Sequence, residues 1–289
     1  MKPAPFEHVA VDGEAEAIAV LAQHGGDAKV LAGGQSLVPM LNMRLSRPAV
    51  LVDINRAAGL DRLAESNGAL SVGPLVRQRA LERWASTRCP LVAEALRSVG
   101  HPAIRTRGTV VGSIAHADPA SELPALLLCL DGSVIARAAR GERTLPAADF
   151  FVGPLATALE PDELVSEVRV SLPPPDAGWG FAEVARRHGD FALVGAAALL
   201  SCGGDGRVTR ARLAFFGVGG KPVRGQAAEG ALTGHAPTAA AIRDAARAAA
   251  DALAPDDDLH ATASYRKRVA AVLAERTLAA ALGRSRSAA

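Results

Sequence analysis

Ala32-Gly33-Gly34-Gln35-Ser36 is the stretch that decides the fold of this chain, because it places two adjacent glycines between an apolar segment and a short expected helix. A second glycine-bearing stretch, Thr109 to Pro119, lies roughly 75 residues further along the 289-residue chain. Glycine lets a backbone approach a ligand without a Cβ in the way. Exposed N–H groups at such turns attract phosphate oxygens. The two stretches therefore predict a bulky diphosphate ligand that is held from two sides.

The first stretch predicts a phosphate cradle made by the backbone N–H groups of residues 33–36. The alternative interpretation is an ordinary turn between a strand and a helix. A dinucleotide site of the Rossmann type requires the spacing G-x-G-x-x-G, which Gly33-Gly34-Gln35-Ser36 does not supply. A nicotinamide-binding Rossmann fold is therefore disfavoured.

The second stretch carries more polar side chains. Thr109, Gly112 and Ser113 are suited to line a phosphate or a ribityl chain. Asp118 is expected either to contact the ligand or to cap a helix that begins near Glu122. Both roles are compatible with each other.

Charged residues surround the second stretch. Arg105 and Arg107 precede it and are expected either to offset phosphate charge or to be ordinary surface arginines. His116 is either a ligand contact or a packing residue of the loop. Because His116-x-Asp118 is not a known metal spacing, no metal site is expected.

The composition narrows the classes of function. With a formal net charge of +2, a nucleic-acid partner is not expected. Cys89, Cys129 and Cys202 are far apart, so this chain is not expected to hold a disulfide framework or an iron–sulfur cluster. No apolar run of about 18 residues occurs, so no integral membrane segment is expected and a cytoplasmic location is the default. No catalytic residue is assigned, and a cofactor is expected to supply the chemistry.

Hydrophobic periodicity predicts a β-α-β-loop-α-β unit in about the first 56 residues. A second unit mixes helices and strands. Its expected elements are strands at 70–73, 133–138 and 164–172, helices at 78–85, 91–99 and 122–130, an irregular basic stretch at 101–108, and a turn around Phe150-Phe151.

Pro173-Pro174-Pro175 is the expected domain boundary, because consecutive prolines continue neither a helix nor a strand ladder. Beyond it, the pattern predicts an antiparallel sheet covered by helices, with a frayed tail from Gly283. The expected elements are strands at 180–188, 191–202 and 207–217 and helices at 227–232, 238–253 and 264–282. The expected domains are 1–175, divided into subdomains of about 1–56 and 57–175, and 176–289.

Motifs that occur in order along nearly the whole chain carry a resemblance to a known family. They are Ala32-Gly33-Gly34-Gln35-Ser36-Leu37, Asn42-Met43-Arg44-Leu45, Leu51-Val52-Asp53-Ile54, Ile104-Arg105-x-Arg107-Gly108-Thr109, Ala115-His116-Ala117-Asp118-Pro119-Ala120, Pro124-Ala125, Phe150-Phe151-x-Gly153, Asp162-Glu163-Leu164, Arg187-x-Gly189-Asp190-x-Ala192 and Tyr265-Arg266. Together they resemble the flavin-binding medium subunit of the molybdenum hydroxylases, a group that includes aerobic carbon monoxide dehydrogenase and xanthine dehydrogenase.

This resemblance implies an α+β fold, with a two-subdomain FAD-binding domain of the vanillyl-alcohol-oxidase (PCMH) type and a smaller C-terminal α+β domain of the CO dehydrogenase flavoprotein type. It implies non-covalent FAD, extended between the subdomains, with its flavin ring toward the C-terminal domain. The first stretch would hold one side of the pyrophosphate and the second the other side and the ribityl region. The implied cofactor-binding residues are Ala32, Gly33, Gly34, Gln35, Ser36, Leu37, Thr109, Val111, Gly112, Ser113, Ala117, Asp118, Glu122 and Val165.

The resemblance also implies partners and a reaction. A molybdenum cofactor on a large subunit would oxidise the substrate, and [2Fe–2S] clusters on a small subunit would carry the electrons. The flavin of this chain would then pass them to an external acceptor such as a quinone, O₂ or NAD⁺. A dimer of heterotrimers is the implied assembly.

Two departures from the family pattern stand out. Val111 occupies a position that is usually glycine, and a β-branched residue there is expected to shift the stretch or to keep one N–H further from the phosphate. Some relatives have a lysine just after the position of Phe181, whereas this chain has Ala182 and Glu183. Without that cation, anionic reduced flavin would be stabilised less.

Two other functions stay open at this point. One is an autonomous FAD-dependent oxidoreductase with its own substrate pocket. The other is a non-catalytic nucleotide-binding assembly subunit. A yellow purified protein would exclude a flavin-free subunit, and co-purification with molybdenum and iron would favour the hydroxylase complex.

Overall fold

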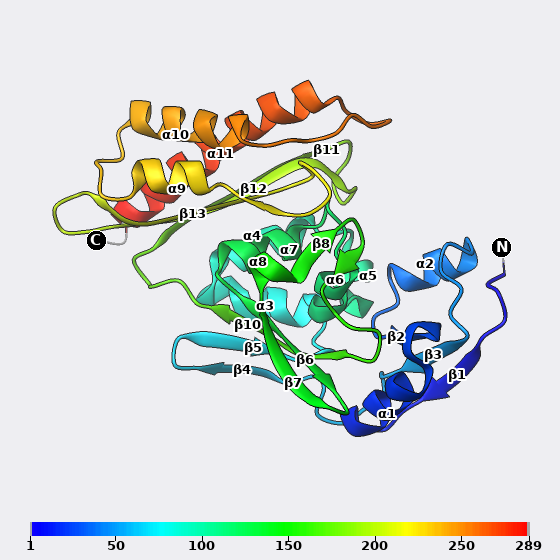
Figure 1. Ribbon diagram of the computed structural model, residues 1–289. Helices are drawn as coiled ribbons and strands as arrows, with labels where there is room; N and C mark the ends of the chain where they lie inside the picture. The colour runs from blue at the N-terminus through cyan, green and yellow to red at the C-terminus, as the bar shows by residue number, and fades with distance from the viewer. Residues whose placement is uncertain (1, 288–289) are drawn as a thin grey trace.

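The computed structural model describes residues 2–287, and the chain forms three parts. In Figure 1 the first part, in blue, lies at the lower right, and the second occupies the centre. The third, a sheet with helices, lies above the second part. This arrangement agrees with the expected FAD-binding domain of two subdomains and a smaller C-terminal domain.

The first part is a parallel sheet with strand order β1-β3-β2. Its elements are β1 (Glu7–Ala10), α1 (Glu14–His24), the 3₁₀ turn η1 (Gly25–Asp27), β2 (Ala28–Leu31), α2 (Leu37–Asn42) and β3 (Val50–Asp53). Helix α1 buries Ala17 and Leu21, which lie four residues apart on one face. The predicted β-α-β-loop-α-β order is confirmed, and the first glycine stretch follows the carboxyl end of β2.

The second part is an antiparallel sheet with strand order β4-β5-β10-β6-β7, and it is packed with helices. Its elements are β4 (Leu63–Ser66), β5 (Ala69–Val72), α3 (Gln78–Arg88), α4 (Pro90–Ser98), α5 (Pro102–Arg107), α6 (Val110–His116), α7 (Glu122–Cys129), β6 (Ser133–Ala138), β7 (Gly141–Pro146), α8 (Ala147–Phe150), β8 (Phe151–Gly153), β9 (Ala156–Thr157) and β10 (Leu164–Ser171).

Several predictions for this part are wrong. The basic stretch that was expected to be irregular forms α5, because Pro102 at its first turn lacks the N–H that a helix start leaves unpaired. Most of the second glycine stretch is α6 rather than a loop. The edge strand β7 is largely exposed, so it lacks the apolar alternation that would have predicted it. The expected turn around Phe150-Phe151 contains α8 and β8.

The third part is an antiparallel sheet with strand order β11-β12-β13-β14. Its elements are β11 (Gly178–Ala185), β12 (Ala192–Cys202), β13 (Val208–Phe216), β14 (Val223–Arg224), α9 (Gln226–Leu232), α10 (Ala239–Asp251) and α11 (Ala263–Ser287). The predicted sheet covered by helices is confirmed. The prediction of a frayed tail is wrong for residues 283–287, because they continue α11. The last two residues of that predicted tail lie outside the described part of the chain.

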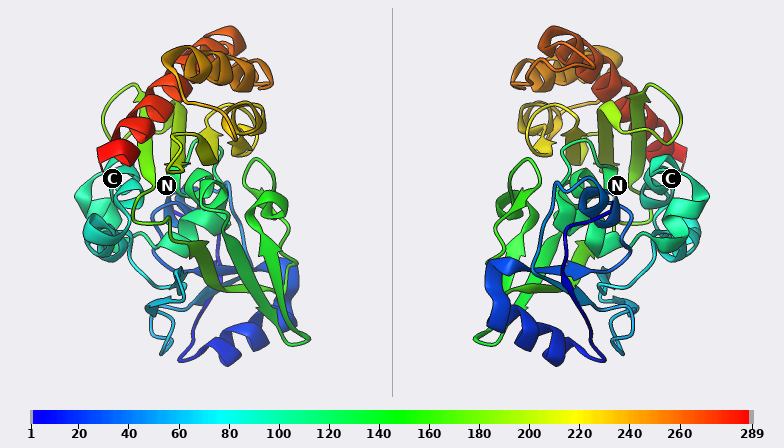
Figure 2. Two further views of the ribbon diagram at one scale, coloured as in Figure 1. Left: turned by 90° about the vertical axis from the view of Figure 1, so that its left-hand side faces the viewer. Right: turned by 90° about the vertical axis from the view of Figure 1, so that its right-hand side faces the viewer.

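The sheet of the third part is covered on both faces, because alternate residues of a strand point in opposite directions. Val194, Ala196 and Ala198 belong to the core beneath α10 and α11. Ala197 and Leu199 point the other way and join the core of the second part. Figure 2 shows the third part seated on the helices of the second part from both sides.

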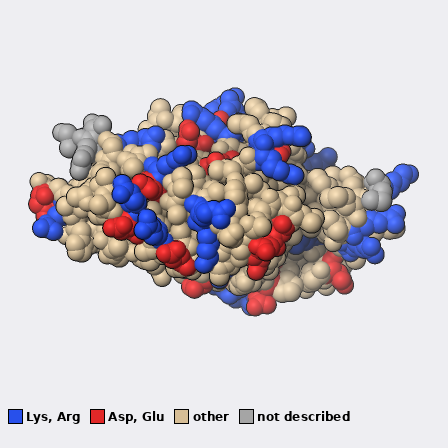
Figure 3. Space-filling model, turned by 90° about the horizontal axis from the view of Figure 1, so that it is seen from above, with Lys and Arg blue, Asp and Glu red and all other residues tan. Residues whose placement is uncertain are grey.

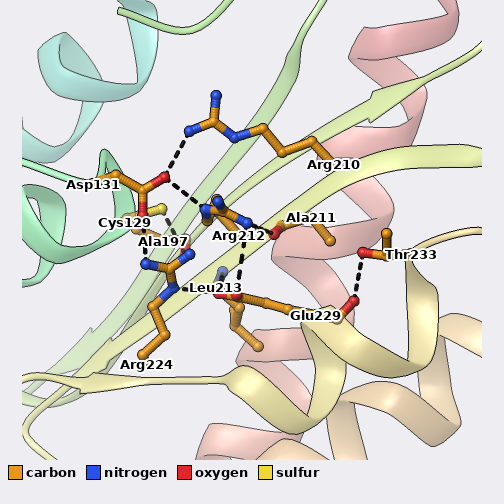
Figure 4. A network of polar contacts seen from close by, with 10 residues as sticks. All are labelled: Cys129, Asp131, Ala197, Arg210, Ala211, Arg212, Leu213, Arg224, Glu229 and Thr233. Atoms are coloured by element: carbon orange, nitrogen blue, oxygen red, sulfur yellow. Dashed lines mark hydrogen bonds and ion pairs between the residues drawn. The ribbon is translucent and has the colours of Figure 1, made fainter. Parts of the chain in front are cut away.

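An ion-pair network joins the second and third parts (Figure 4). The Asp131 carboxylate, just after α7, accepts hydrogen bonds from Arg210 at 2.7 Å, Arg212 at 2.8 Å and Arg224 at 2.5 Å. Burial would raise the pKa of Asp131, but the hydrogen bonds from these arginines outweigh it and hold the pKa below its usual range. Arg224 also bonds Glu229 of α9 at 2.6 Å. The network therefore ties the two parts together through charged side chains.

The outer surface shows mixed charge. In the view from above, basic and acidic side chains are interspersed over the visible face (Figure 3). Within residues 2–287, no helix combines the length and the apolar character that crossing a membrane requires. No patch of a single charge sign dominates the face shown.

Candidate functional site

The two glycine stretches contact each other in the structure. A Cβ built on Gly33 would lie 2.6 Å from the carbonyl oxygen of Arg107 and 2.9 Å from the backbone nitrogen of Thr109. Gly34 has φ +71°, a left-handed conformation that favours glycine. Segments about 75 residues apart in the sequence therefore meet at a point where only glycine fits.

The start of α6 explains the glycine of the second stretch. Thr109 is the N-cap, and its Oγ1 accepts a hydrogen bond of 3.1 Å from the backbone N–H of Gly112. A Cβ on Gly112 would lie 2.5 Å from that Oγ1, so a side chain there would break the cap. The Oγ of Ser113 lies 3.2 Å from the Oγ of Ser121. A capped helix start thus stands where the sequence predicted a loop.

Val111 does not occupy a backbone conformation that requires glycine. It is the second residue of α6, and its φ angle is not positive. Its side chain is 3% exposed and packs in the core of the second part. A β-branched residue is compatible with helical backbone, so valine is not strained at this position. Its effect on the approach of a phosphate stays a prediction.

Asp118 lies in the turn after α6, beyond Ala117, which has φ +53° and is buried. The Oδ1 of Asp118 accepts a 2.9 Å hydrogen bond from the backbone N–H of Ala120. The N-cap of α7 is Ser121. The expectation that Asp118 caps this helix is therefore wrong, because its carboxylate closes the preceding turn instead.

A cleft of about 670 Å³ opens at the first glycine stretch, and we call it the glycine cleft. It is lined by residues 31–35 together with Asp53, Asn55, Arg77 and Arg107. The Nδ2 of Asn55 donates to the carbonyl of Ala32 at 2.8 Å, which fixes the start of the stretch. Asn55 and Arg77 were not predicted as site residues, because nothing in their local sequence indicates that they reach this stretch.

Arg105 does not reach the glycine cleft. It is 5% exposed and its Nε donates to Glu82 at 3.0 Å, while Nη1 donates to the carbonyls of Val99 and Gly100. The charge of Arg105 is therefore neutralised inside the protein. Of the two arginines expected to offset phosphate charge, only Arg107 lines the cleft.

A second cleft, of about 540 Å³, lies where the second and third parts meet, and we call it the junction cleft. Asp118 lines it together with residues 189–191 of the turn between β11 and β12 and with Ala192 and Leu193 at the start of β12. So does Arg266, which is 7% exposed and donates to Asp258 at 2.6 Å. Backbone hydrogen bonds from residues 260 and 261 lower the pKa of Asp258 to about 2.

Glu122 at the start of α7 is buried, and Glu183 on β11 is half-buried and close enough for its charge to act on Glu122. Burial, followed by the charge of Glu183, raises the pKa of Glu122 to about 8. Burial likewise raises the pKa of Glu183 to about 7, and among residues 2–287 no hydrogen-bond partner reaches its buried Oε2. The structure therefore puts a carboxyl of raised pKa at this junction.

The remaining predicted residues lie at varied depths. Val165 on β10 is 5% exposed, and neither it nor Glu122 lines either cleft. Ser36 is the N-cap residue of α2, and Leu37 is the first residue of that helix. Burial lowers the pKa of His116. In the described residues, no three His, Cys, Asp or Glu side chains are grouped as a metal ion would require.

Comparisons with known proteins agree with this architecture. The model of the FAD-binding domain in molybdopterin dehydrogenase matches residues 4–174, and that of the CO dehydrogenase flavoprotein C-terminal domain matches residues 179–281. The chain is 43% identical to 6-hydroxypseudooxynicotine dehydrogenase complex subunit alpha of Paenarthrobacter nicotinovorans, over 99% of this chain and 97% of the relative. It is 35% identical to the carbon monoxide dehydrogenase medium chain of Hydrogenophaga pseudoflava, over 98% and 99% of the two chains.

Solved structures show the same likeness. A chain of carbon monoxide dehydrogenase from Hydrogenophaga pseudoflava superposes with a TM-score of 0.95 at 37% identity. The match covers 98% of this chain and 99% of that chain. The likeness therefore extends over both domains rather than over one module.

Proposed function

Because this chain belongs to the FAD-binding medium subunits of the molybdenum hydroxylases, we propose that FAD lies extended between the glycine cleft and the junction cleft. The observation that carries the proposal is the contact at Gly33, where a Cβ would meet Arg107 at 2.6 Å. Main-chain groups from two distant stretches are thereby brought to one place. A diphosphate needs such a cradle of N–H groups.

The chain is an FAD subunit of a multi-subunit oxidoreductase complex with large and small subunits, and its role is electron transfer within that complex. When bound, FAD supplies the redox centre of this subunit. The molybdenum cofactor and the iron–sulfur clusters belong to the partner subunits. The proposed path leads from a [2Fe–2S] cluster to this flavin and then to an external acceptor.

The residue assignments follow the geometry. Residues 32–37 would hold one side of the diphosphate, and Thr109, Val111, Gly112 and Ser113 the other, with Val111 contributing main chain alone. Ala117 and Asp118 would border the ribityl chain, since Asp118 lines the junction cleft. Glu122 and Val165 are at most 6% exposed and would contact the nucleotide only from beneath the surface of the site.

Three further features belong to the proposal. The complex is a dimer of heterotrimers, as the family resemblance implies. Its location is cytoplasmic, which suits the free thiols of Cys89, Cys129 and Cys202. The domains are 1–175, with subdomains of about 1–56 and 57–175, and 176–289; the proline run 173–175 lies between β10 and β11.

Asp118→Asn tests the ribityl assignment. The asparagine side chain keeps an oxygen that can accept the hydrogen bond from the backbone N–H of Ala120, but it loses the negative charge and one acceptor oxygen. We expect FAD to bind about tenfold more weakly, as hydrogen bonds to charged groups contribute about 1.5–3 kcal/mol, while the melting temperature changes little. Titration of the apoprotein with FAD, followed by flavin fluorescence, measures the affinity.

The matched control is Asp176→Asn, which removes a charge from an exposed residue outside both clefts. It should leave FAD affinity unchanged. If Asp118→Asn binds FAD as tightly as the wild type does, Asp118 only closes its turn and the ribityl assignment is wrong.

A further inference from the structure

Two arginines line the glycine cleft without a carboxylate bound to either guanidinium. Arg77, the N-cap residue of α3, and Arg107, the last residue of α5, both border residues 31–35. Within residues 2–287, neither takes part in an ion pair, whereas Arg105 of the same helix α5 is paired with Glu82 at 3.0 Å. Uncompensated arginines beside a glycine turn indicate a site for an anion.

Arg77 is fixed to both glycine stretches. Its Nη1 donates to the carbonyl of Arg107 at 2.6 Å, next to the second stretch. Its Nη2 donates to the Oδ1 of Asn55 at 2.9 Å, and Asn55 in turn donates to the carbonyl of Ala32 in the first stretch. Arg77 and Thr109 also form an antiparallel bridge. The guanidinium is therefore pre-organised at the contact between the two stretches.

The one carboxylate that lines this cleft is already engaged. Asp53 accepts hydrogen bonds from the backbone N–H of Asn55 at 2.9 Å and from its Nδ2 at 2.7 Å. Its other oxygen lies 3.1 Å from the Nε2 of His8. Burial lowers the pKa of Arg77, and the charge of Arg107 lowers it further. The charge of this cleft would therefore be balanced by a bound anion.

We propose that Arg77 and Arg107 form the cationic side of the diphosphate site and contact the phosphate oxygens of FAD. This inference rests on the proposed function, because it assigns two further residues to the same ligand. FAD carries one negative charge on each of its two phosphates, and two guanidinium groups match that number. Backbone N–H groups alone would then not account for the affinity.

Arg77→Gln and Arg107→Gln test the inference in the full-length apoprotein. Two probes are titrated: FAD, and riboflavin, which has the same ring and ribityl chain but no phosphate. Each variant should bind FAD about ten- to hundredfold more weakly than the wild type, as expected for loss of a charge-assisted hydrogen bond. Each variant should bind riboflavin as tightly as the wild type does. FAD affinity of the wild type should fall with added salt, and that dependence should be smaller in both variants.

Arg77→Lys and Arg83→Gln are the companion variants. The lysine keeps the charge and should recover part of the FAD affinity, although it cannot bond Asn55 and Arg107 as a guanidinium does. Arg83 is exposed on the same helix outside the cleft, so its substitution should change neither titration.

Two outcomes would overturn the inference. Unchanged FAD affinity in both glutamine variants would show that the arginines do not contact the phosphates. An equal loss of riboflavin and FAD binding would show that they only support the fold. If the wild type itself failed to bind FAD, the proposed function would be wrong, and that result is distinct from the other two.

Discussion

Gly33→Ala is expected to weaken FAD binding by about tenfold or more and to lower the free energy of unfolding by about 1–3 kcal/mol, the usual cost of overpacking. The added Cβ would lie 2.6 Å from the carbonyl oxygen of Arg107 and 2.8 Å from the Cα of Gly108. These are backbone atoms and cannot rotate away as a side chain can. The two stretches would have to separate, and the cradle that they form would widen.

The FAD-to-protein ratio after purification and urea denaturation measure the two effects. Gly26→Ala is the matched control, because a Cβ on Gly26 would meet no atom within 4 Å and its φ is not positive. It should retain FAD and stability like the wild type. Full FAD occupancy and unchanged stability in Gly33→Ala would mean that the contact between the stretches is not part of the site.

Glu122→Gln is expected to change how stability depends on pH. Burial and Glu183 raise the pKa of Glu122 from 4.5 to about 8, so the folded protein holds a proton that the unfolded chain releases. Stability should therefore fall as pH rises from about 4.5 to about 8. Glutamine resembles the protonated carboxyl group and does not titrate, so the variant should not lose stability as the pH rises. At pH 8 the variant should be more stable by about 2–4 kcal/mol, since one pKa unit corresponds to about 1.4 kcal/mol.

Urea denaturation of both proteins at pH 5 and pH 8 measures the difference. The two proteins should be of similar stability at the lower pH and diverge at the higher one. Glu7→Gln, an exposed substitution on β1, should leave the pH dependence as it is in the wild type. Parallel pH profiles for wild type and Glu122→Gln would refute the assignment of a buried, protonated carboxyl to Glu122.

The first glycine stretch could be predicted from the sequence, because the pattern that indicates it lies in adjacent residues. Two glycines after an apolar strand and before a helix indicate a turn of close backbone approach. The structure adds the physical reason why each of these two positions requires glycine. Gly34 needs its left-handed φ of +71°, whereas Gly33 needs space for the backbone of residues 107–109. The second requirement comes from a segment distant in sequence and could not be predicted.

The second stretch was predicted less well for a related reason. Its glycine indicated a loop, but Thr109 provides a helix cap, so Gly112 serves the cap rather than a positive φ. The expected effect of Val111 assumed a loop conformation, whereas Val111 lies in α6. Local patterns therefore predicted which two stretches form the site, a prediction that the proposed experiments test, but not the backbone geometry of the second stretch.

Side chains that act through long-range contacts were the hardest to predict. Arg105 and Arg107 stand two residues apart in a basic stretch, and the sequence does not distinguish them. Glu82, which is 23 residues away, removes Arg105 from the site. Asn55 brings Arg77 to it across 22 residues. Charge neutralisation of this kind depends on tertiary packing.

Hydrogen–deuterium exchange of the full-length chain with and without FAD tests the central claim most directly. FAD should slow amide exchange in residues 32–37 and 109–118 together, because their N–H groups would hold the diphosphate and the adjoining chain of the nucleotide. Riboflavin has no diphosphate, so its addition should leave the exchange rates of the amides at the diphosphate end of the site unchanged. Slowed exchange confined to other segments, with FAD demonstrably bound, would contradict the account.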